Sequence, residues 1–392
     1  MSAKLRLHAA PGTLVSLAVV LALAVAGLVA LSGAEAAAVQ QVNCGDTITT
    51  DTTLHKDLVD CPNNGIIIGA DNVTLDLNGH TIDGDGTPAA GCDPNTEFCD
   101  VGVVNFGHDG VTVMHGSMRQ FAGGVNFGEV RHNRLLDISA SRNRFVGIQL
   151  FNSSRSLIRN SSGTGSTAPD HGTGLGLFNS RHVRIVGNSF RHTTHHALVT
   201  IDSDDNLIKG NRFSGNDDEG ILMEGGERNE ITRNRLAHNG AGITLGPGSR
   251  NEIAKNRVSG GRDGIRIEKG RGNLVADNLV VGTRHAGIRL GIHHPSLGGA
   301  HNVVRRNLVR DSDVDGFVVT KKDHHSLLKR NVAKGAGDDG FDVEGRTAKL
   351  TRNRALRNHD LGIEAVRGVI DGGGNVARHN GDPRQCTNIA CS

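Results

Sequence analysis

Short apolar segments separated by polar turns recur along this chain every 22 or 23 residues. Each unit holds two to four alternating apolar positions, as in residues 220–223 (Gly-Ile-Leu-Met), before Gly, Asn or Asp interrupts the pattern. Alternation over so few positions predicts short strands, and no stretch inside the repeats has a sustained helical period. A period in this range predicts stacked units, each too small to bury its apolar face alone.

Two series of residues mark the repeat. Asparagines close an N-x-[aliphatic]-x-x-N phrase or its degenerate forms, at Asn188, Asn211, Asn234, Asn256, Asn278, Asn307, Asn331 and Asn353. Small residues precede the apolar residue that opens a strand, at Gly124, Gly147, Gly174, Ala197, Gly220, Gly242, Gly264, Gly287, Gly316, Gly340 and Gly362. Stacked Asn side chains can hydrogen-bond to the coils above and below, and Gly is expected where the backbone turns with positive φ.

These features predict an all-β fold, a single-stranded right-handed parallel β-helix of about twelve coils from Gly65 to roughly Asn380. Each coil would contain three short strands, and strands of successive coils would pair in parallel about 4.8 Å apart. A leucine-rich repeat has a similar period. It would require L-x-x-L-x-L spacing and a helical or extended return on each turn, which the repeats do not show.

The termini predict four segments. Residues 1–38 have the features of a signal peptide, with Lys4 and Arg6 before an apolar stretch at 14–31 and small-residue cleavage sites at 34–38. An uncleaved membrane anchor is the alternative, and either predicts export, which favours a secreted, extracellular protein. An N-terminal cap (39–64), the β-helix (65–380) and a disulfide-linked tail (381–392) would follow.

Charge and cysteine content narrow the class of protein. Removing residues 1–38 leaves 41 basic and 40 acidic residues, which argues against a nucleic-acid or membrane partner beyond the signal segment. Six cysteines outside the regular repeats fit an oxidising compartment. Among 15 possible connectivities we predict sequence-local pairs, 44–61, 92–99 and 386–391. Trp and Tyr are absent, which counts against binding of neutral sugars on aromatic platforms and less against a polyanionic sugar.

Residues 65–84 carry a resemblance to a known superfamily. Val73, Leu75 and Leu77 alternate through a predicted strand, and Asn78-Gly79 marks a turn. This phrase resembles the first coil of secreted right-handed β-helix proteins, which include pectate-lyase-like enzymes, alginate epimerases and NosD-type copper-associated periplasmic proteins. The resemblance covers most of residues 65–380 and implies the fold rather than a particular chemistry.

Residues between two inward apolar positions should point outward and form columns. The first column reads Gln149, Leu222, Thr244, Arg266, Arg289, Val318, Asp342 and Glu364, and a second reads Glu224, Glu268, Thr320 and Glu344. Arg266 and Arg289 lie on adjacent coils, where like charges repel. Glu268 or an anionic ligand should compensate them, so Arg266, Arg289 and Glu268 are candidate substrate-binding residues. A solvated ladder of ion pairs is the alternative.

Two acidic phrases lie one coil apart, Asp-Val-Asp-Gly-Phe at 313–317 and Asp-Asp-Gly-Phe-Asp at 338–342. They resemble the calcium-binding signature of the family-nine polysaccharide lyases, which are β-helical pectate lyases. The resemblance implies four Ca²⁺ ligands, Asp315, Asp338, Asp339 and Asp342. Hard oxygen donors suit this cation, and without it such crowding would raise some carboxyl pKa values. The alternative is that Asp-Gly is the turn this solenoid prefers.

The catalytic base departs from the lyase pattern. In that family a Lys follows Gly-Phe on a subsequent coil, and Glu364 stands at this place here. Arg289, Lys321 and Lys322 are substitutes within reach, and we take Arg289 and Lys322 as the catalytic candidates. Calcium and an Arg would neutralise a uronate carboxylate while a base removes the C5 proton. Loss of the C4 oxygen would make the protein a lyase, and reprotonation on the other face would make it an epimerase.

Histidines form a further candidate group, at His192, His195, His196, His285, His293, His294, His324 and His325. Such clusters can bind copper or zinc, but His196 and His285 should lie roughly 20 Å apart, so one shared site is not expected. Polar turns are the alternative. Two longer coils, 161–172 and 291–300, predict loops, the second beside Arg289.

The sequence therefore favours a monomeric, calcium-assisted lyase or C5-epimerase acting on an acidic polysaccharide. Two alternatives remain. A non-catalytic surface module could bind a polymer or a protein through a flat polar face. A glycoside hydrolase could use two of the carboxylates at 315, 339 and 342 around the bond that it cleaves.

Overall fold

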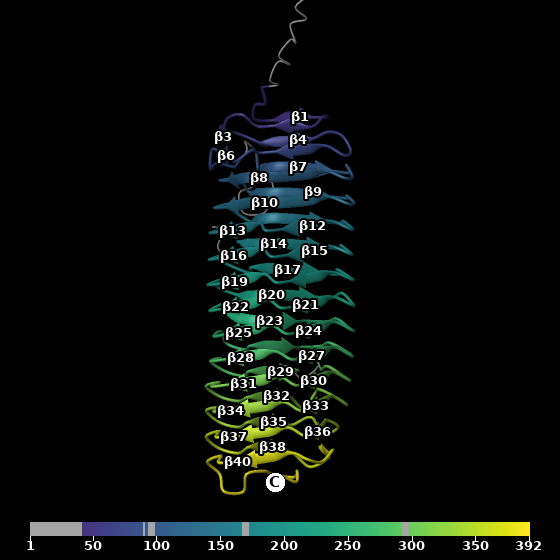
Figure 1. Ribbon diagram of the computed structural model, residues 1–392, viewed down its shortest axis with the longest axis vertical. Helices are drawn as coiled ribbons and strands as arrows, with labels where there is room; N and C mark the ends of the chain where they lie inside the picture. The colour runs from purple at the N-terminus through teal and green to yellow at the C-terminus, as the bar shows by residue number, and fades with distance from the viewer. Residues whose placement is uncertain (1–40, 89–90, 93–98, 167–171, 292–297) are drawn as a thin grey trace, which may run out of the picture. The chain divides into compact units, whose positions relative to one another are not determined.

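The computed structural model describes residues 41–88, 91–92, 99–166, 172–291 and 298–392. These residues form a parallel β-helix, and Figure 1 shows its strands stacked coil upon coil from β1 to β38. No α-helix occurs in the described ranges. The predicted all-β solenoid is confirmed, with 14 strands along its longest sheet, and therefore 14 coils, in place of about twelve.

Each coil contributes one strand to sheet 1, which is separate from the other two faces. Its strands are β1 (Asp46–Ile48), β4 (Ile66–Ile68), β7 (Val101–Phe106), β9 (Gly123–Gly128), β11 (Val146–Phe151), β14 (Thr173–Phe178), β17 (Leu198–Ile201), β20 (Glu219–Glu224), β23 (Ala241–Leu245), β26 (Ile265–Ile267), β29 (Ile288–Leu290), β32 (Phe317–Val319), β35 (Phe341–Val343) and β38 (Ile363–Ala365).

Sheets 2 and 3 are joined because two long strands, β8 (Thr112–Arg119) and β10 (Arg134–Ser141), run through both. The other strands of sheet 2 are β2 (Thr52–Thr53), β5 (Thr74–Asp76), β12 (Leu157–Arg159), β15 (Arg184–Val186), β18 (Leu207–Lys209), β21 (Glu230–Thr232), β24 (Glu252–Ala254), β27 (Leu274–Ala276), β30 (Val303–Arg305), β33 (Leu327–Lys329), β36 (Lys349–Thr351) and β39 (Ile370–Asp371). Those of sheet 3 are β3 (Leu58–Cys61), β6 (Thr81–Gly84), β13 (Ser162–Thr164), β16 (Ser189–Arg191), β19 (Arg212–Ser214), β22 (Arg235–Ala237), β25 (Arg257–Ser259), β28 (Leu279–Val281), β31 (Leu308–Arg310), β34 (Val332–Lys334), β37 (Arg354–Leu356) and β40 (Val376–Arg378).

The core is one continuous column of side chains inside the three sheets. Identical registers place Ile243, Ile265 and Ile288 of sheet 1 directly above one another, and all three are buried. The rings of Phe317 and Phe341 stack with centroids 4.6 Å apart and nearly parallel planes. Because each coil supplies only a few apolar side chains, its core is completed by its neighbours on the stack.

The predicted asparagine column is confirmed as a buried ladder. The Asn188 side-chain amide donates to Asn211 Oδ1 at 3.0 Å and to the Ile158 carbonyl at 3.0 Å, and the pattern repeats down to Asn375. A second ladder, which the sequence analysis did not identify, runs through Asn229, Asn251, Asn273 and Asn302. An unpaired buried amide is costly, so these ladders hold successive coils in one register.

The glycines that open the sheet 1 strands serve a different purpose from the one expected. Gly124 and Gly316 do not have positive φ. A Cβ on either would lie 2.6 Å from a carbonyl oxygen of the next coil, so close backbone approach excludes a side chain. Many turns with positive φ are instead made by polar residues such as Arg233 (φ 56°) and Lys255 (φ 58°).

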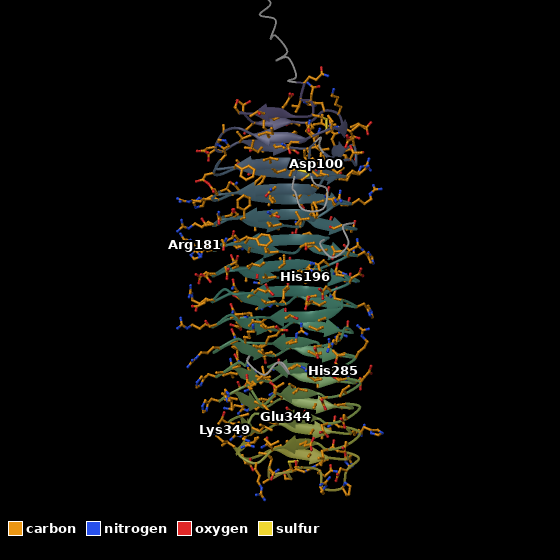
Figure 2. All side chains as sticks on the ribbon, turned by 180° about the vertical axis from the view of Figure 1, so that it is seen from behind. Asp100, Arg181, His196, His285, Glu344 and Lys349 are labelled. Atoms are coloured by element: carbon orange, nitrogen blue, oxygen red, sulfur yellow. A yellow bond between two sulfur atoms is a disulfide. The ribbon has the colours of Figure 1, made fainter. Side chains whose placement is uncertain are left out.

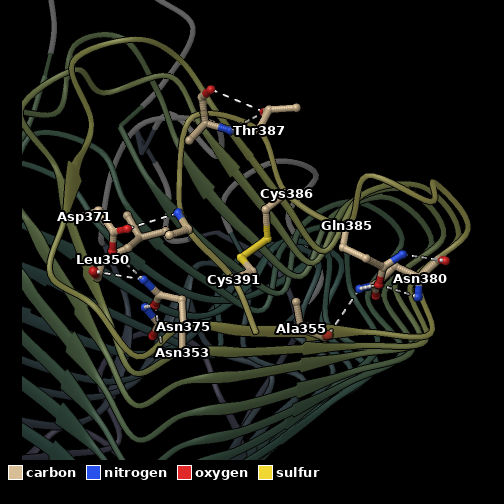
Figure 3. Close-up of a disulfide and its surroundings, with 12 residues drawn as sticks. Leu350, Asn353, Ala355, Asp371, Asn375, Asn380, Gln385, Cys386, Thr387 and Cys391 are labelled. Atoms are coloured by element: carbon tan, nitrogen blue, oxygen red, sulfur yellow. Dashed lines mark hydrogen bonds between the residues drawn. A yellow bond between two sulfur atoms is a disulfide. The ribbon is translucent and has the colours of Figure 1, made fainter.

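All three predicted disulfides are present, Cys44–Cys61, Cys92–Cys99 and Cys386–Cys391. One expectation about them is wrong, because Cys61 lies in β3, inside a regular coil. Strand β1 already pairs with β4, so the stack begins before the boundary expected at Gly65. At the other end, Cys386 pairs with Ile363 and Cys391 with Asn375, so the tail lies against the last coil (Figure 3).

Several predictions fall outside the described residues. They are the signal peptide or anchor at 1–38, parts of both long loops (167–171 and 292–297), and His293 and His294. Among the residues that are described, no helix is long and apolar enough to span a membrane.

Candidate functional site

The outward columns of sheet 1 have the predicted register. Arg266 pairs with Arg289 in the next strand, and two coils further on Asp342 pairs with Glu364. Many of these outward side chains are nevertheless buried, because they pack against one another along the column. The Arg289 side chain is only 7% exposed. We call this outward surface, from β17 to β38, the sheet 1 strip.

The aspartates that precede the strand-opening glycines have a structural role. Asp263 Oδ1 accepts the Ala286 backbone N–H at 3.2 Å, Asp315 Oδ1 accepts that of Asp339 at 3.2 Å, and Asp339 Oδ1 accepts that of Leu361 at 2.7 Å. Each carboxylate therefore fastens one coil to the next. The Asp-Gly phrase is a genuine turn of this solenoid, and each carboxylate keeps its second oxygen for other contacts.

Arg266 lies among three carboxylates. Its guanidinium contacts Glu219 Oε1 at 3.1 Å, Glu268 Oε1 at 3.0 Å and Asp263 Oδ2 at 3.7 Å. Glu268 therefore compensates Arg266 as expected, and two further acids share the task. The side chain of Arg266 is 20% exposed, so a ligand on the strip can still reach it.

His285, Asp263 and Arg289 form the most enzyme-like arrangement on the strip. His285 Nδ1 lies 3.2 Å from Asp263 Oδ1, and the Arg289 guanidinium contacts both ring nitrogens of His285. Asp263 is almost fully buried, whereas a third of the His285 side chain is exposed. Arg289 also lies 3.6 Å from Asp263 Oδ1, and burial lowers the pKa of this guanidinium.

Sequence reasoning missed this dyad. The sequence analysis did not single out Asp263, and it treated His285 only as one of many histidines. The signal that could have found it was positional, because Asp263 occupies the same place before the glycine as Asp315 and Asp339 do. His285 lies one coil later, immediately before Ala286, the residue whose N–H Asp263 accepts.

The acidic end of the strip has the raised pKa values that crowding predicts. Burial is the largest cause in each carboxyl. It raises the pKa of Asp315 to about 6, that of Asp342 to about 7 and that of Asp339 to about 8. The charges of Asp338 and Glu364 add to all three effects, and Asp339 also shares a hydrogen bond with Glu364. Protonated carboxyl groups are therefore present here near neutral pH.

Of the four predicted calcium ligands, two meet in a group able to hold a cation. Asp338, Asp339 and Asp360 each place a carboxylate oxygen within 4.8 Å of the others. Asp360 was not predicted, and Asp315 and Asp342 are not part of this group. Three carboxylates on two adjoining coils match the hard oxygen donors that Ca²⁺ prefers.

A second possible metal group contains imidazoles. His195, His196 and Asp218 place ligand atoms within 4.8 Å of one another. His196 Nδ1 also lies 3.0 Å from Glu219 Oε2, and Glu219 in turn contacts Arg266. As expected, His196 and His285 do not belong to one group of potential metal ligands. They are linked instead through Glu219, Arg266 and Asp263, and Figure 2 shows His196, His285 and Glu344 along one side of the stack.

The two catalytic candidates from the sequence have different environments. Arg289 lies inside the network just described. Lys322 is exposed on the turn after β32 and forms no ion pair with any described residue. Its neighbour Lys321 lies 3.6 Å from Glu344 and is also exposed. Lys322 thus remains a prediction without a partner on the strip.

Comparison with known proteins agrees with this architecture. A family model described as a right-handed β-helix region matches residues 173–297, and one described as periplasmic copper-binding protein (NosD) matches residues 237–372. Together with the structural likenesses below, these matches support the right-handed parallel β-helix fold. No curated protein matches the chain in sequence.

Solved structures share the fold at low sequence identity. A mutant of the periplasmic alginate epimerase AlgG superposes with a TM-score of 0.56 and 14% identity, covering 75% of this chain and 77% of that one. The catalytic domain of a GH87 α-1,3-glucanase, in complex with tetrasaccharides, has a TM-score of 0.50 and 14% identity, covering 89% of this chain and 63% of the other. Likeness at this level shows the fold alone.

The NosD match raises the question of copper. Copper favours imidazole and sulfur ligands. Among the described residues of the matched segment 237–372, the only compact group of potential ligands is the acidic triad of Asp338, Asp339 and Asp360. The donor set there does not fit copper. The imidazole-containing group at His195, His196 and Asp218 fits a transition metal better, but it lies outside the matched segment.

Proposed function

We propose that this protein is an exported carbohydrate-active enzyme that removes the C5 proton of a uronate in an acidic polysaccharide, as a lyase or a C5-epimerase. The exposed imidazole of His285, held by the buried Asp263 and by Arg289, carries the proposal. A histidine oriented by a buried carboxylate is a common general base. The periplasmic alginate epimerase that shares the fold supports a uronate as the substrate class.

His285 takes the role of base in place of the two candidates from the sequence. A guanidinium stays protonated, so Arg289 is suited to neutralise a carboxylate rather than to accept a proton. The contact with Asp263 favours the tautomer in which Nδ1 donates to that carboxylate. Nε2 would accept the C5 proton once the substrate carboxylate draws the Arg289 guanidinium away from the imidazole. Lys322 has no comparable orienting partner.

Arg266 and Arg289 would bind the carboxylate of the substrate. They lie on adjacent coils next to His285, and neutralising that carboxylate stabilises the enolate-like charge that forms as the proton leaves. Asp315 and Asp342 lie on the next two coils, and burial raises the pKa of Asp342 to about 7 and that of Asp315 to about 6. In its protonated form either carboxyl would return a proton. Return to the opposite face of C5 gives epimerisation, and elimination of the C4 oxygen gives a lyase.

Calcium is part of this proposal. Asp338, Asp339 and Asp360 would hold the ion, and bound there it would supply positive charge that offsets repulsion between the acidic end of the strip and an anionic polymer. The carboxylates of Asp315 and Asp342 would then face the substrate instead of the ion.

The test uses the full chain and a panel of uronate polymers with millimolar calcium in D₂O. We expect either epimerised residues that carry solvent deuterium at C5, detected by NMR, or unsaturated products whose C5 has lost its hydrogen. His285→Gln should lower the rate by about 10²- to 10⁴-fold, the range of general-base contributions. His301→Gln, which changes an exposed histidine outside the strip, is the control and should retain activity. Absence of both C5 exchange and unsaturated product with every polymer would refute the proposal and favour a non-catalytic binding module.

A glycoside hydrolase is the second candidate, favoured by one observation. Burial raises the pKa of Asp339 to about 8, so this carboxyl would serve at neutral pH as the general acid that a glycosidase requires, with a more distant carboxylate of the strip as its partner. The fold likeness to a GH87 α-1,3-glucanase agrees with this candidate. It predicts new reducing ends with neither C5 exchange nor unsaturated product, lost in Asp339→Asn and kept in His285→Gln. The opposite dependence on the two variants supports the lyase or epimerase.

A further inference from the structure

Sheet 3 carries a column of arginines far from the catalytic proposal. Arg212 in β19 pairs in register with Arg235 in β22, and Arg235 pairs with Arg257 in β25. Neighbouring strands of a sheet are about 4.8 Å apart, so the three guanidinium groups start at that spacing along the stack. All three side chains are exposed. We call this column the arginine ladder.

The arginine ladder lacks the compensation that the arginines of sheet 1 have. None of the three side chains forms an ion pair with a described residue, whereas Arg266 contacts three carboxylates. From β13 to β40, no strand of sheet 3 contains an aspartate or glutamate. Like charges in adjacent strands repel, so binding of an anionic ligand would stabilise the three arginines.

The surface around the ladder is concave. A groove of about 360 Å³ is lined by the three arginines together with Leu236, Ala237 and Ser259. A small floor (Ala237 and Ser259) lies beside the long basic side chains, so a ligand can approach the backbone while the guanidinium groups contact its anionic groups. Arg233 and Lys255, on the turns that precede β22 and β25, add positive charge at the edge of this surface.

We infer that the arginine ladder binds a linear acidic polysaccharide, with successive carboxylates of the polymer contacting successive arginines along the stack. A regular column of cations selects a polymer with a regular column of anions, and guanidinium groups bind carboxylates in bidentate geometry. Because sheet 1 holds the proposed catalytic site, this second surface would retain a long chain on the protein. It deepens the proposed function but does not depend on catalysis.

The surface fits other polyanions less well. Single-stranded nucleic acids are usually bound by aromatic side chains that stack on bases, and the groove lining contains none. An anionic membrane surface would need apolar side chains that insert, and Leu236, the largest apolar residue of the lining, is buried. Both remain as outcomes of the experiment.

The test measures binding of oligo-uronates of increasing length to the full chain by titration calorimetry at several salt concentrations. Affinity should increase with length until the oligomer spans three arginines, and it should fall with salt. The triple variant Arg212→Gln, Arg235→Gln, Arg257→Gln should bind about tenfold or more weakly and with less salt dependence. Circular dichroism verifies folding, and the single variant Arg235→Glu replaces the triple variant if that one does not fold.

A second triple variant distinguishes binding at the arginine ladder from the effect of lowering the net positive charge of the protein. Arg330→Gln, Arg352→Gln, Arg354→Gln removes the same charge from exposed positions further along the stack and should keep the affinity. Equal weakening by both triples, tighter binding of single-stranded DNA, or binding only to anionic vesicles would each overturn the inference. Calorimetry measures binding without turnover, so a failure of the catalytic proposal can be told apart from a failure of this one.

Discussion

At the scale of single residues, burial decides what the acidic side chains do. Aspartates at the same position of the repeat have different neighbours. Asp263 contacts two arginines and a histidine, whereas Asp339 lies beside other carboxylates and has its pKa raised to about 8. The sequence predicted that these carboxylates would be crowded. It did not predict which ones would have a cationic partner, because that depends on side chains two or three coils away.

Asp323 offers a pH test away from the strip. It is fully buried, and burial raises its pKa to about 6. The folded protein therefore holds an extra proton between the ordinary value near 4 and about 6, so this group makes stability fall as pH rises through that window. Asp323→Asn should raise the free energy of unfolding at pH 8 by up to about 3 kcal/mol and bring no gain at pH 4. Urea unfolding at both pH values measures this.

The control is Asp311→Asn, which changes an exposed aspartate on the same stack. It should alter stability by less than about 0.5 kcal/mol at either pH. A gain for Asp323→Asn of equal size at pH 4 and pH 8 would contradict a buried charge as the cause. The Asn302 side chain donates to Asp323 Oδ2, and the amide oxygen of the variant can still accept that bond.

At the scale of elements, the coil is the unit that the sequence predicts well. The register of the sheet 1 columns and the asparagine ladder follow from spacing alone, because side chains one repeat apart become vertical neighbours. The disulfides join cysteines only 17, 7 and 5 residues apart, and their pairing was predicted from that proximity. The second asparagine ladder was missed because only the asparagines that close the N-x-[aliphatic]-x-x-N phrase were followed. Its members open the same phrase and have the same spacing, with 29 residues at one step in both ladders. The role of the glycines was also missed, because close approach of two coils is not visible in one coil.

The ladder itself can be tested at Asn256. This side chain donates to Asn278 Oδ1 at 3.1 Å and to the Ile231 carbonyl at 2.8 Å, and its oxygen accepts from Asn234. Asn256→Leu leaves buried partners on both neighbouring coils unpaired, so we expect a loss of about 3 kcal/mol or more in the free energy of unfolding. Glu252→Leu, on the exposed face of β24, is the control with little expected change. A loss below about 1 kcal/mol at Asn256 would show that the ladder is not what fixes the register.

The acidic triad predicts stabilisation by a divalent cation at the level of two adjoining coils. Calcium at millimolar concentration should raise Tm, and the rise should be greater at pH 8 than at pH 5, because protonated carboxyls bind the ion poorly. Asp360→Asn should abolish the rise, whereas Asp311→Asn should keep it. Differential scanning calorimetry with calcium, magnesium and chelator measures the effect. An unchanged Tm in calcium at both pH values would remove this site from the proposal.

At the scale of the whole molecule, stability is shared between neighbouring coils and charge is divided between faces. Sheet 1 carries the mixed acidic and basic strip, and the sheet 3 strands from β13 to β40 carry only basic or uncharged side chains. The net charge of the whole sequence is near zero and does not reveal how charge is divided between the faces. The sequence analysis therefore placed its substrate-binding candidates on sheet 1 and did not identify the arginine ladder. Three disulfides indicate an oxidising compartment and hold segments near both ends of the stack.

Stacks of repeats unfold first at their ends, so the C-terminal disulfide should stabilise the last coils and have little effect on the middle of the stack. Cys386→Ser with Cys391→Ser frees a tail that pairs with Ile363 and Asn375 of the last coil (Figure 3). Hydrogen exchange should become faster in β37, β38 and β40 and stay unchanged in β17 and β20. Uniformly faster exchange along the whole stack would instead show that the protein unfolds as one cooperative unit.

The sequence by itself determined the repeat, the parallel β-helix and the inward and outward columns. Each of these depends only on distances along the chain that the period converts into vertical contacts. The tertiary structure alone decided which charged groups meet. His285 with Asp263 and Arg289, Asp360 with Asp338 and Asp339, and the uncompensated arginines of sheet 3 all depend on how side chains pack between coils. Burial then sets their protonation, and no periodicity along the chain encodes it.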